Sequence, residues 1–145
     1  MNPNLPASQQ TATINGKVFL QGGTILFAPP IGIGSVPFVY GTFTVNGDVN
    51  WTGGTYKPSV DYTTAGLANK WIVNGKMTSA AACVIEPNPQ RGATPPASSN
   101  WDILQAETTA GNLPSVVAGS TLTLGQFDAG GKKVWKLASP AAPPN

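Results

Sequence analysis

Apolar and polar residues alternate on both sides of the Asn-Gly pair at positions 46–47. Alternation with a period of two predicts two strands, each with one buried face. A two-residue loop would put their apolar residues on opposite faces, whereas a three-residue connection, Asn46–Asp48, puts all of them on one face. These apolar residues are Phe43, Val45, Val49 and Trp51. The pattern therefore favours a three-residue turn, which would pair Val45 with Val49, or a corner of a solenoid.

The same pattern occurs three times along the chain. Segment 14–25 reads INGKVFLQGGTI, segment 45–56 reads VNGDVNWTGGTY, and segment 73–77 keeps only the front half, VNGKM. The copies start at 14, 45 and 73, so they are 31 and 28 residues apart. A repeat of this length indicates one supersecondary unit stacked on copies of itself.

Glycine and asparagine mark the turns of each repeat, because both residues tolerate the backbone conformations of tight corners. The predicted turn residues are Asn15, Gly16, Asn46, Gly47, Asn74, Gly75, Gly22, Gly23, Gly53 and Gly54. Each unit would then hold three short strands separated by two tight turns. The sequence predicts an all-β fold, either a short β-solenoid of about three to four coils or a hairpin-rich β-sandwich.

The remaining elements are predicted from apolar runs and breakers. Strands are expected within 11–27, 38–45, 48–52, 55–60, 70–73, 77–85, 101–107, 115–117, 121–127 and 133–137. Loops are expected at 28–34 and 62–69, and a long proline-rich surface excursion at 86–100. The predicted organisation is an N-terminal arm at 1–10, a single repeat domain at 11–137 and a proline-rich C-terminal tail at 138–145.

Composition narrows the possible functions. Charged residues make up 10% of the 145 residues and the net charge is +2, without a basic run, so nucleic acid is not an expected partner. The absence of histidine excludes histidine-based metal sites and catalytic triads, and no metal or cofactor is expected. Cys83 stands alone in an apolar run and is expected to be buried. No apolar stretch is long enough for a membrane span, and the first residues do not have the pattern of a signal peptide.

No catalytic constellation is predicted. The six carboxylates have no spacing that demands a pair, and Asp48 and Asp128 lie in predicted turns. The aromatic residues are the main binding candidates, because exposed rings can stack on sugars. Tyr56, Tyr62 and Trp101 are the candidate ligand-binding residues, whereas Trp51 and Trp71 are expected to fill the core.

Two segments carry a resemblance to a known group of proteins: 41–56, and 101–106 followed by 111–114. From about residue 14 to 117 the chain resembles the short imperfect repeats of bacterial surface and extracellular right-handed β-helix proteins, such as autotransporter passengers. The resemblance implies a right-handed β-solenoid that serves presentation, adhesion or scaffolding, and it implies no catalytic residues.

A solenoid this short would leave open ends, whose unpaired backbone groups favour stacking or need caps. We therefore expect a non-enzymatic structural protein that self-assembles as an oligomer or filament, in the extracellular space, on a cell surface or on a virion. The candidate assembly residues near the ends of the repeat domain are Thr11, Thr13, Lys133 and Trp135. The alternatives are a polysaccharide-binding or adhesion module and, as a third reading, a polysaccharide-degrading β-helix enzyme.

Overall fold

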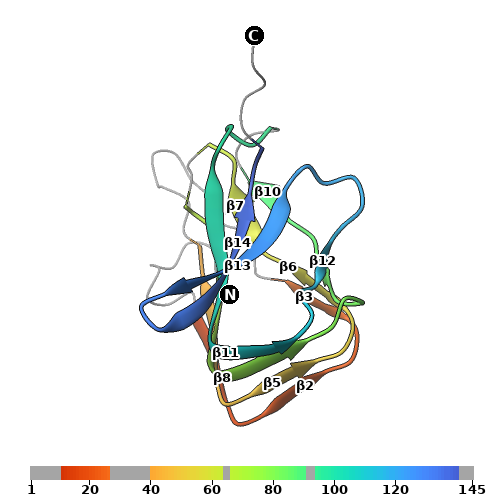
Figure 1. The fold of residues 1–145 in the computed structure, drawn as a ribbon, viewed down its shortest axis with the longest axis vertical. Helices are drawn as coiled ribbons and strands as arrows, with labels where there is room; N and C mark the ends of the chain where they lie inside the picture. Colours follow the sequence, from red (N-terminus) through yellow and green to blue (C-terminus); the bar gives the residue numbers. More distant parts are fainter. Residues whose placement is uncertain (1–10, 27–39, 64–65, 91–93, 141–145) are drawn as a thin grey trace.

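The computed structural model describes residues 11–26, 40–63, 66–90 and 94–140. The described residues form strands and no helix, which confirms the predicted all-β class (Figure 1). The strands are β1 (Thr11–Asn15), β2 (Val18–Leu20), β3 (Thr24–Leu26), β4 (Thr42–Asn46), β5 (Val49–Trp51), β6 (Thr55–Lys57), β7 (Ser59–Asp61), β8 (Lys70–Ser79), β9 (Val84–Ile85), β10 (Asn88–Gln90), β11 (Asn100–Gly111), β12 (Ser115–Val116), β13 (Thr123–Ala129) and β14 (Lys132–Ala138). The predicted arm at 1–10 and the predicted loop at 28–34 lie outside the described residues.

The first twelve strands form four successive rows. Row 1 contains β1, β2 and β3, row 2 contains β4 to β7, row 3 contains β8 to β10, and row 4 contains β11 and β12. Each row pairs in parallel with the next, so β1, β4, β8 and β11 are neighbours in one sheet and β3, β6, β9 and β12 in another. Figure 1 shows β2, β5, β8 and β11 lying one above another.

The pairing register reproduces the sequence repeat. Ile14 is paired with Val45 and Val45 with Val73, which are offsets of 31 and 28 residues. Of the two alternatives expected around Asn46, the three-residue turn that pairs Val45 with Val49 is therefore wrong, because each strand pairs with its counterpart in the next row. The predicted common face is confirmed for Val45, Val49 and Trp51, which are all buried.

Row 3 departs from the predicted boundaries. Asn74 and Gly75 lie inside the continuous ten-residue strand β8 and do not interrupt it. The two preceding Asn-Gly corners have glycines with positive φ, 122° at Gly16 and 156° at Gly47, whereas Gly75 is not among the glycines with positive φ. The expected surface excursion at 86–100 also contains strand β10, which pairs in parallel with β7.

The core lies between the sheets and is filled by large side chains. Trp71 is fully buried, and its ring lies 5.7 Å from Trp51 and 5.3 Å from Tyr56 between ring centroids. The buried apolar residues come from rows 2, 3 and 4 and from the segment that follows them. Burial of aromatic rings of this size is a dominant favourable term in folding.

Glycines stack where the rows turn. A Cβ atom on Gly54 of row 2 would lie 2.7 Å from the carbonyl oxygen of Gly23 in row 1. Gly54 also has a φ of +100°, a conformation that residues with a side chain rarely adopt. Two physical reasons therefore favour glycine at this predicted turn: the close contact between rows and the backbone conformation.

The last two strands reverse the direction of pairing. β14 pairs antiparallel with β11 on one side and with β13 on the other. Leu137 of β14 is fully buried. The predicted start of the tail at residue 138 is too early, because Ala138 ends β14 and the Ser139 N–H donates to the Ser99 carbonyl oxygen at 2.9 Å. Residues 141–145 lie outside the described chain.

Candidate functional site

Row 1 has a free edge within the described part of the chain. β1 pairs with β4, β2 with β5 and β3 with β6, and none of the three has a described partner on its other side. All five residues of β1 are exposed. Ile14 is 43% exposed, whereas its counterparts in rows 2 and 3, Val45 and Val73, are at most 1% exposed. Among the described residues, no strand therefore covers the apolar interior at this end.

Backbone polar groups at this edge point away from the stack. The Gly16 N–H donates to the Asn46 carbonyl oxygen at 3.0 Å, so the Gly16 amide faces β4. Successive amides of a strand point to opposite sides. The backbone groups of Thr11, Thr13 and Asn15 therefore face the free side, where an incoming strand could bind them.

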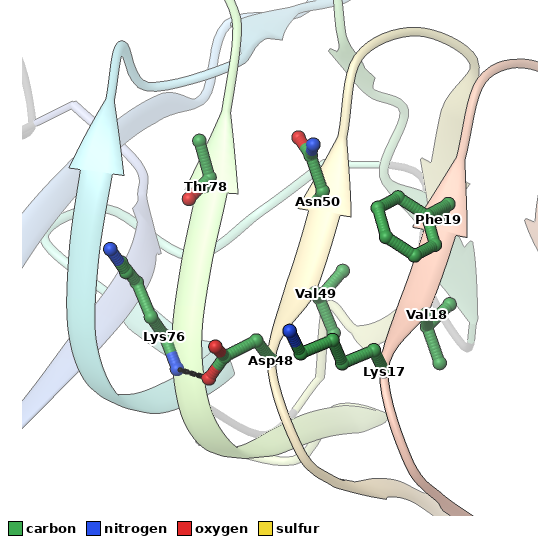
Figure 2. A pocket seen from close by; sticks show the side chains of 8 residues that line it. All are labelled: Lys17, Val18, Phe19, Asp48, Val49, Asn50, Lys76 and Thr78. Carbon is green, nitrogen blue, oxygen red and sulfur yellow. Dashed lines mark hydrogen bonds between the residues drawn. The ribbon is translucent and has the colours of Figure 1, made fainter.

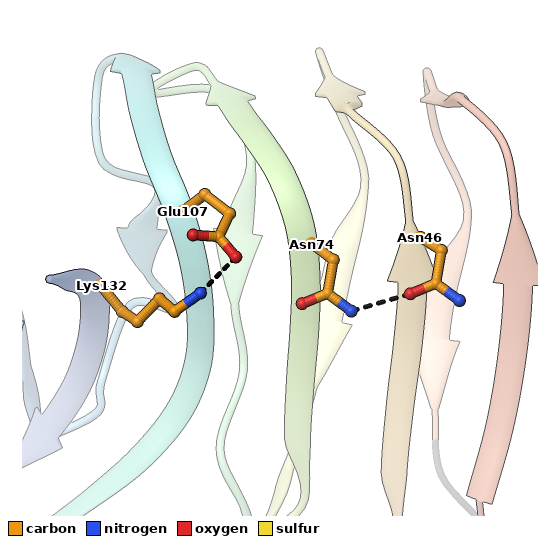
Figure 3. Close-up of polar contacts among 4 residues, drawn as sticks. All are labelled: Asn46, Asn74, Glu107 and Lys132. Atoms are coloured by element: carbon orange, nitrogen blue, oxygen red, sulfur yellow. Dashed lines mark hydrogen bonds and ion pairs between the residues drawn. The ribbon is translucent and has the colours of Figure 1, made fainter. Parts of the chain in front are cut away.

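A ladder of asparagine side chains leads to the same edge. The Asn74 Nδ2 donates to the Asn46 Oδ1 at 2.7 Å (Figure 3), and the Asn46 Nδ2 donates to the Asn15 Oδ1 at 2.8 Å. The Nδ2 of Asn15 has no acceptor among the described residues. The ladder therefore ends in an unused donor group at row 1.

At the opposite end of the eight-stranded sheet, the hairpin of β13 and β14 covers the edge of β11. Ion pairs attach this hairpin to β11: Lys132 contacts Glu107 (Figure 3), and the Lys136 Nζ lies 3.3 Å from the Asp102 Oδ1. Both pairs are partly exposed, so each contributes little to stability, on the order of 0–1 kcal/mol. The closure therefore depends mainly on the buried side chains of β14.

A shallow hollow of about 210 Å³ lies on the outer face of β2, β5 and β8 (Figure 2). Phe19, Asn50 and Thr78 are in register on the three strands and form its floor. Phe19 is 66% exposed, because its side chain points away from the core between inward-facing neighbours. The Asp48 Oδ1 accepts a hydrogen bond from the Lys76 backbone N–H at 2.8 Å at the rim. An exposed ring beside amide and hydroxyl groups can stack on a sugar.

The structure does not bring the predicted ligand-binding aromatics together on a surface. Tyr56 is fully buried and its hydroxyl donates to the Ile103 carbonyl oxygen at 2.9 Å, while Trp101 is fully buried and its Nε1 donates to the Asp61 carbonyl oxygen at 3.1 Å. Tyr62 is half-buried, with its ring 5.8 Å from Trp101. The expected exposure of Tyr56 and Trp101 is wrong, because both rings fill the core.

Sequence reasoning missed Phe19 as a candidate. The available signal was the position of Phe19 between Val18 and Leu20, which share the apolar phase of the repeat. An aromatic residue out of phase with that pattern is expected on the outer face.

The candidate assembly residues fall at the two ends of the molecule. Thr11 and Thr13 are exposed on β1. Lys133 contacts the Asp128 Oδ1 at 2.5 Å within the hairpin. Trp135 is fully buried and its Nε1 donates to the Gln126 Oε1 at 3.1 Å. A direct assembly contact through Trp135 is therefore excluded in this fold, because the ring is not accessible.

The carboxylate side chains have structural partners. Glu86 pairs with Lys57 at 3.1 Å, and the Asp61 Oδ1 accepts from the Thr63 backbone N–H at 2.8 Å. With the pairs of Asp102, Glu107 and Asp128 and the Asp48 contact, each of the six carboxylates has a partner. No group of three or more potential metal ligands occurs among residues that the structure describes.

Cys83 lies in the core, as predicted. Its side chain is fully buried and its Sγ donates to the Trp51 carbonyl oxygen at 3.2 Å. Burial raises the pKa of the Cys83 thiol and, more strongly, the pKa of the Tyr56 hydroxyl, because both anions would be poorly solvated. Both groups therefore stay protonated and structural at neutral pH.

A scan against protein-family models and a search of curated proteins return no match for this chain. Within the described residues, no helix is long and apolar enough to cross a membrane.

Proposed function

We propose that this chain is a non-enzymatic structural protein, built as a short right-handed β-solenoid, that self-assembles through its N-terminal edge. The observation that carries the proposal is the free edge of row 1, where backbone groups and Ile14 are both exposed. Unpaired strand edges bind other strands readily, and proteins that stay monomeric blunt them with charge, proline or bulges. β1 has none of the charged or proline residues that would do so.

Parallel pairing between rows supports the solenoid in this proposal. The chain passes through the same sheets in each row, at offsets that match the sequence repeat. The repeat unit would then be one coil, and rows 1 to 4 would be the three to four coils of the solenoid. Right-handed winding is proposed from the sequence resemblance and from the general handedness of parallel crossover connections.

A structural role fits the chemistry better than catalysis. The carboxylates are all held by lysine or backbone partners, and the buried hydroxyl and thiol groups serve the core. The low charge content of 10% is compatible with a protein exposed outside the cell or on a virion, which is where we place it.

The mass distribution of the purified chain tests self-assembly. Multi-angle light scattering over a hundred-fold concentration range, with negative-stain imaging of the same samples, should give a mass above that of one chain. The variant Thr13→Pro should shift the distribution to the monomer, because it removes a backbone donor on the free side and no bond to β4. Thr44→Val in β4 changes the corresponding residue of row 2 and should leave the mass unchanged. A monomeric wild-type chain at every concentration contradicts the proposal.

A second candidate function, polysaccharide binding, is favoured by Phe19. Its 66% exposure beside Asn50 and Thr78 offers a stacking surface for a sugar ring. Affinity electrophoresis in gels that contain polysaccharides should show retardation that Phe19→Ala abolishes. Phe127→Ala is the matched control, because Phe127 is 52% exposed on β13, far from this hollow in sequence. Equal retardation of both variants would contradict a binding site at Phe19.

A further inference from the structure

We infer that the partner of the free edge is a second copy of the chain, joined head to head by antiparallel pairing of β1 with its symmetry mate. This inference rests on the proposed self-assembly and specifies it. Its consequence is a closed dimer with two-fold symmetry, in place of the filament that two open ends would allow.

The hydrogen-bonding pattern of β1 suits pairing with itself. Thr11, Thr13 and Asn15 present their backbone groups to the free side, as derived from the Gly16–Asn46 bond. A two-fold axis through Thr13 places Thr13 opposite the same residue of the second copy, and Thr11 opposite Asn15. All three are then hydrogen-bonded pairs of an antiparallel ladder, in which the two residues exchange both backbone bonds. No other centre within β1 pairs all three outward-facing residues.

The side chains of β1 are also self-complementary. The sequence of β1, TATIN, alternates polar and apolar residues symmetrically about Thr13. The two-fold axis places Ala12 opposite Ile14, small against large, on the face that continues the core. It also places Thr13 against Thr13 on the outer face, a favourable cross-strand combination. Ile14, 43% exposed in one chain, would then gain an apolar neighbour.

The polar end of the ladder fits the same arrangement. Asn15 would lie opposite Thr11 of the second copy, on the outer face. The Asn15 Nδ2, which has no acceptor among the described residues, would then have a threonine hydroxyl within reach. β1 carries no charged residue, so two copies can meet without like-charge repulsion.

The other end of the molecule does not offer an equivalent surface. At that end the outermost strand of the eight-stranded sheet is β13, which lies outside the four rows and pairs antiparallel with β14. It also carries Asp128, and charged residues on an edge strand disfavour pairing. Head-to-tail growth would require this strand to accept β1, whereas head-to-head pairing uses only the N-terminal ends and therefore stops at two chains.

Cysteine crosslinking tests the register directly. In a hydrogen-bonded antiparallel pair the Cα atoms are about 5.5 Å apart, which is within the range of a disulfide. In a Cys83→Ala background, Thr13→Cys should form a covalent homodimer under mild oxidation in nearly all chains. The matched control is Thr44→Cys, because Thr44 lies beside Thr13 in row 2 but β4 has neighbours on both sides. It should remain monomeric on a denaturing gel.

The outcomes separate this inference from the proposed function. A dimer in light scattering, together with the Thr13→Cys crosslink and no Thr44→Cys crosslink, supports head-to-head pairing. Oligomers larger than two chains, or a dimer without the Thr13→Cys crosslink, overturn the inference and leave self-assembly standing. A monomer overturns both, and protected amides at Thr11, Thr13 and Asn15 of that monomer would indicate that a segment of the same chain covers the edge.

Discussion

Row 1 and the C-terminal hairpin are both terminal parts of one sheet, and they differ in burial. Ile14 in β1 is 43% exposed, whereas Leu137 in β14 is fully buried. Ile14 lies in the alternating strand TATIN, and Leu137 lies in the strand KKVWKLA, which also buries Val134 and Trp135. β14 has a strand on each side, but β1 has a described strand on one side only. An apolar face predicts which way a residue points, and the neighbours of its strand decide whether it is buried.

The largest expected difference is between truncations of these two residues. Leu137→Ala should lower the free energy of unfolding by about 2–5 kcal/mol, because it removes a fully buried side chain and leaves a cavity. Ile14→Ala should cost about 1 kcal/mol or less in dilute solution, where Ile14 is already partly hydrated. Urea denaturation at a concentration that gives a monomer measures both. Equal losses would mean that row 1 is as closed as the hairpin.

The stacked glycines provide the next comparison. Gly54→Ala and Gly23→Ala both place a side chain at positive φ, +100° and +82°, which costs about 1–3 kcal/mol. The Gly54 Cβ would also meet the Gly23 carbonyl oxygen at 2.7 Å, whereas a Cβ on Gly23 meets nothing within 4 Å. We expect Gly54→Ala to be the more destabilising by roughly another 1–3 kcal/mol in thermal unfolding. If Gly23→Ala costs as much, another segment lies over row 1.

Alkaline pH should lower the stability of the fold through two buried groups in rows 2 and 3. The pKa of Cys83 is raised above its ordinary value of 9.0, and the pKa of Tyr56 is raised well above 10.0, both through burial. The unfolded chain loses these protons at the ordinary values, and the folded chain retains them to higher pH. The stability that they contribute is therefore complete below about pH 8.5 and declines as pH rises toward the folded pKa values.

Urea denaturation between about pH 7 and 11 measures this decline. Cys83→Ala should move the onset from about pH 9 to about pH 10, because only the tyrosine contribution remains. An onset that does not move would mean that the thiol titrates at its ordinary pKa and that row 3 is open to solvent.

The smallest expected effect concerns the asparagine ladder. Asn46→Ala removes two side-chain hydrogen bonds, and Asn15→Ala removes one. At about 0.5–1 kcal/mol for each exposed bond, the losses should differ roughly two-fold. Neither residue has a positive φ, so the change adds no backbone strain. Thermal unfolding in dilute solution measures the difference, and a larger loss at Asn15 would mean that its amide has a further partner.

The repeat made much of the fold predictable. The alternation around position 46 placed Val45, Val49 and Trp51 on one buried face, and the repeat spacing of 31 and 28 residues equals the pairing offsets between rows. Local sequence could not decide whether a strand pairs with its neighbour in the chain or with its counterpart one repeat away. Both arrangements bury the same face, and only contacts distant in sequence distinguish them.

The candidate sites were less predictable, because exposure depends on the whole stack. Tyr56 and Trp101 have polar atoms that could face water, yet both donate to backbone carbonyl groups inside the core. The burial of Trp135 was also not predicted, because it results from an antiparallel hairpin that is not part of the repeat. Thr11 and Thr13 precede the first repeat in the sequence, and both are exposed on β1.

Hydrogen–deuterium exchange on the intact chain, followed at several protein concentrations, compares the two ends most directly. We expect the amides of Thr11, Thr13 and Asn15, which face the free side of β1, to exchange rapidly in dilute solution and to become protected as concentration rises. The amides of β14, which have strands on both sides, should be protected at every concentration. Protection of the Thr11, Thr13 and Asn15 amides that is already complete in dilute solution, or that does not change with concentration, would contradict an open N-terminal edge that binds a second chain.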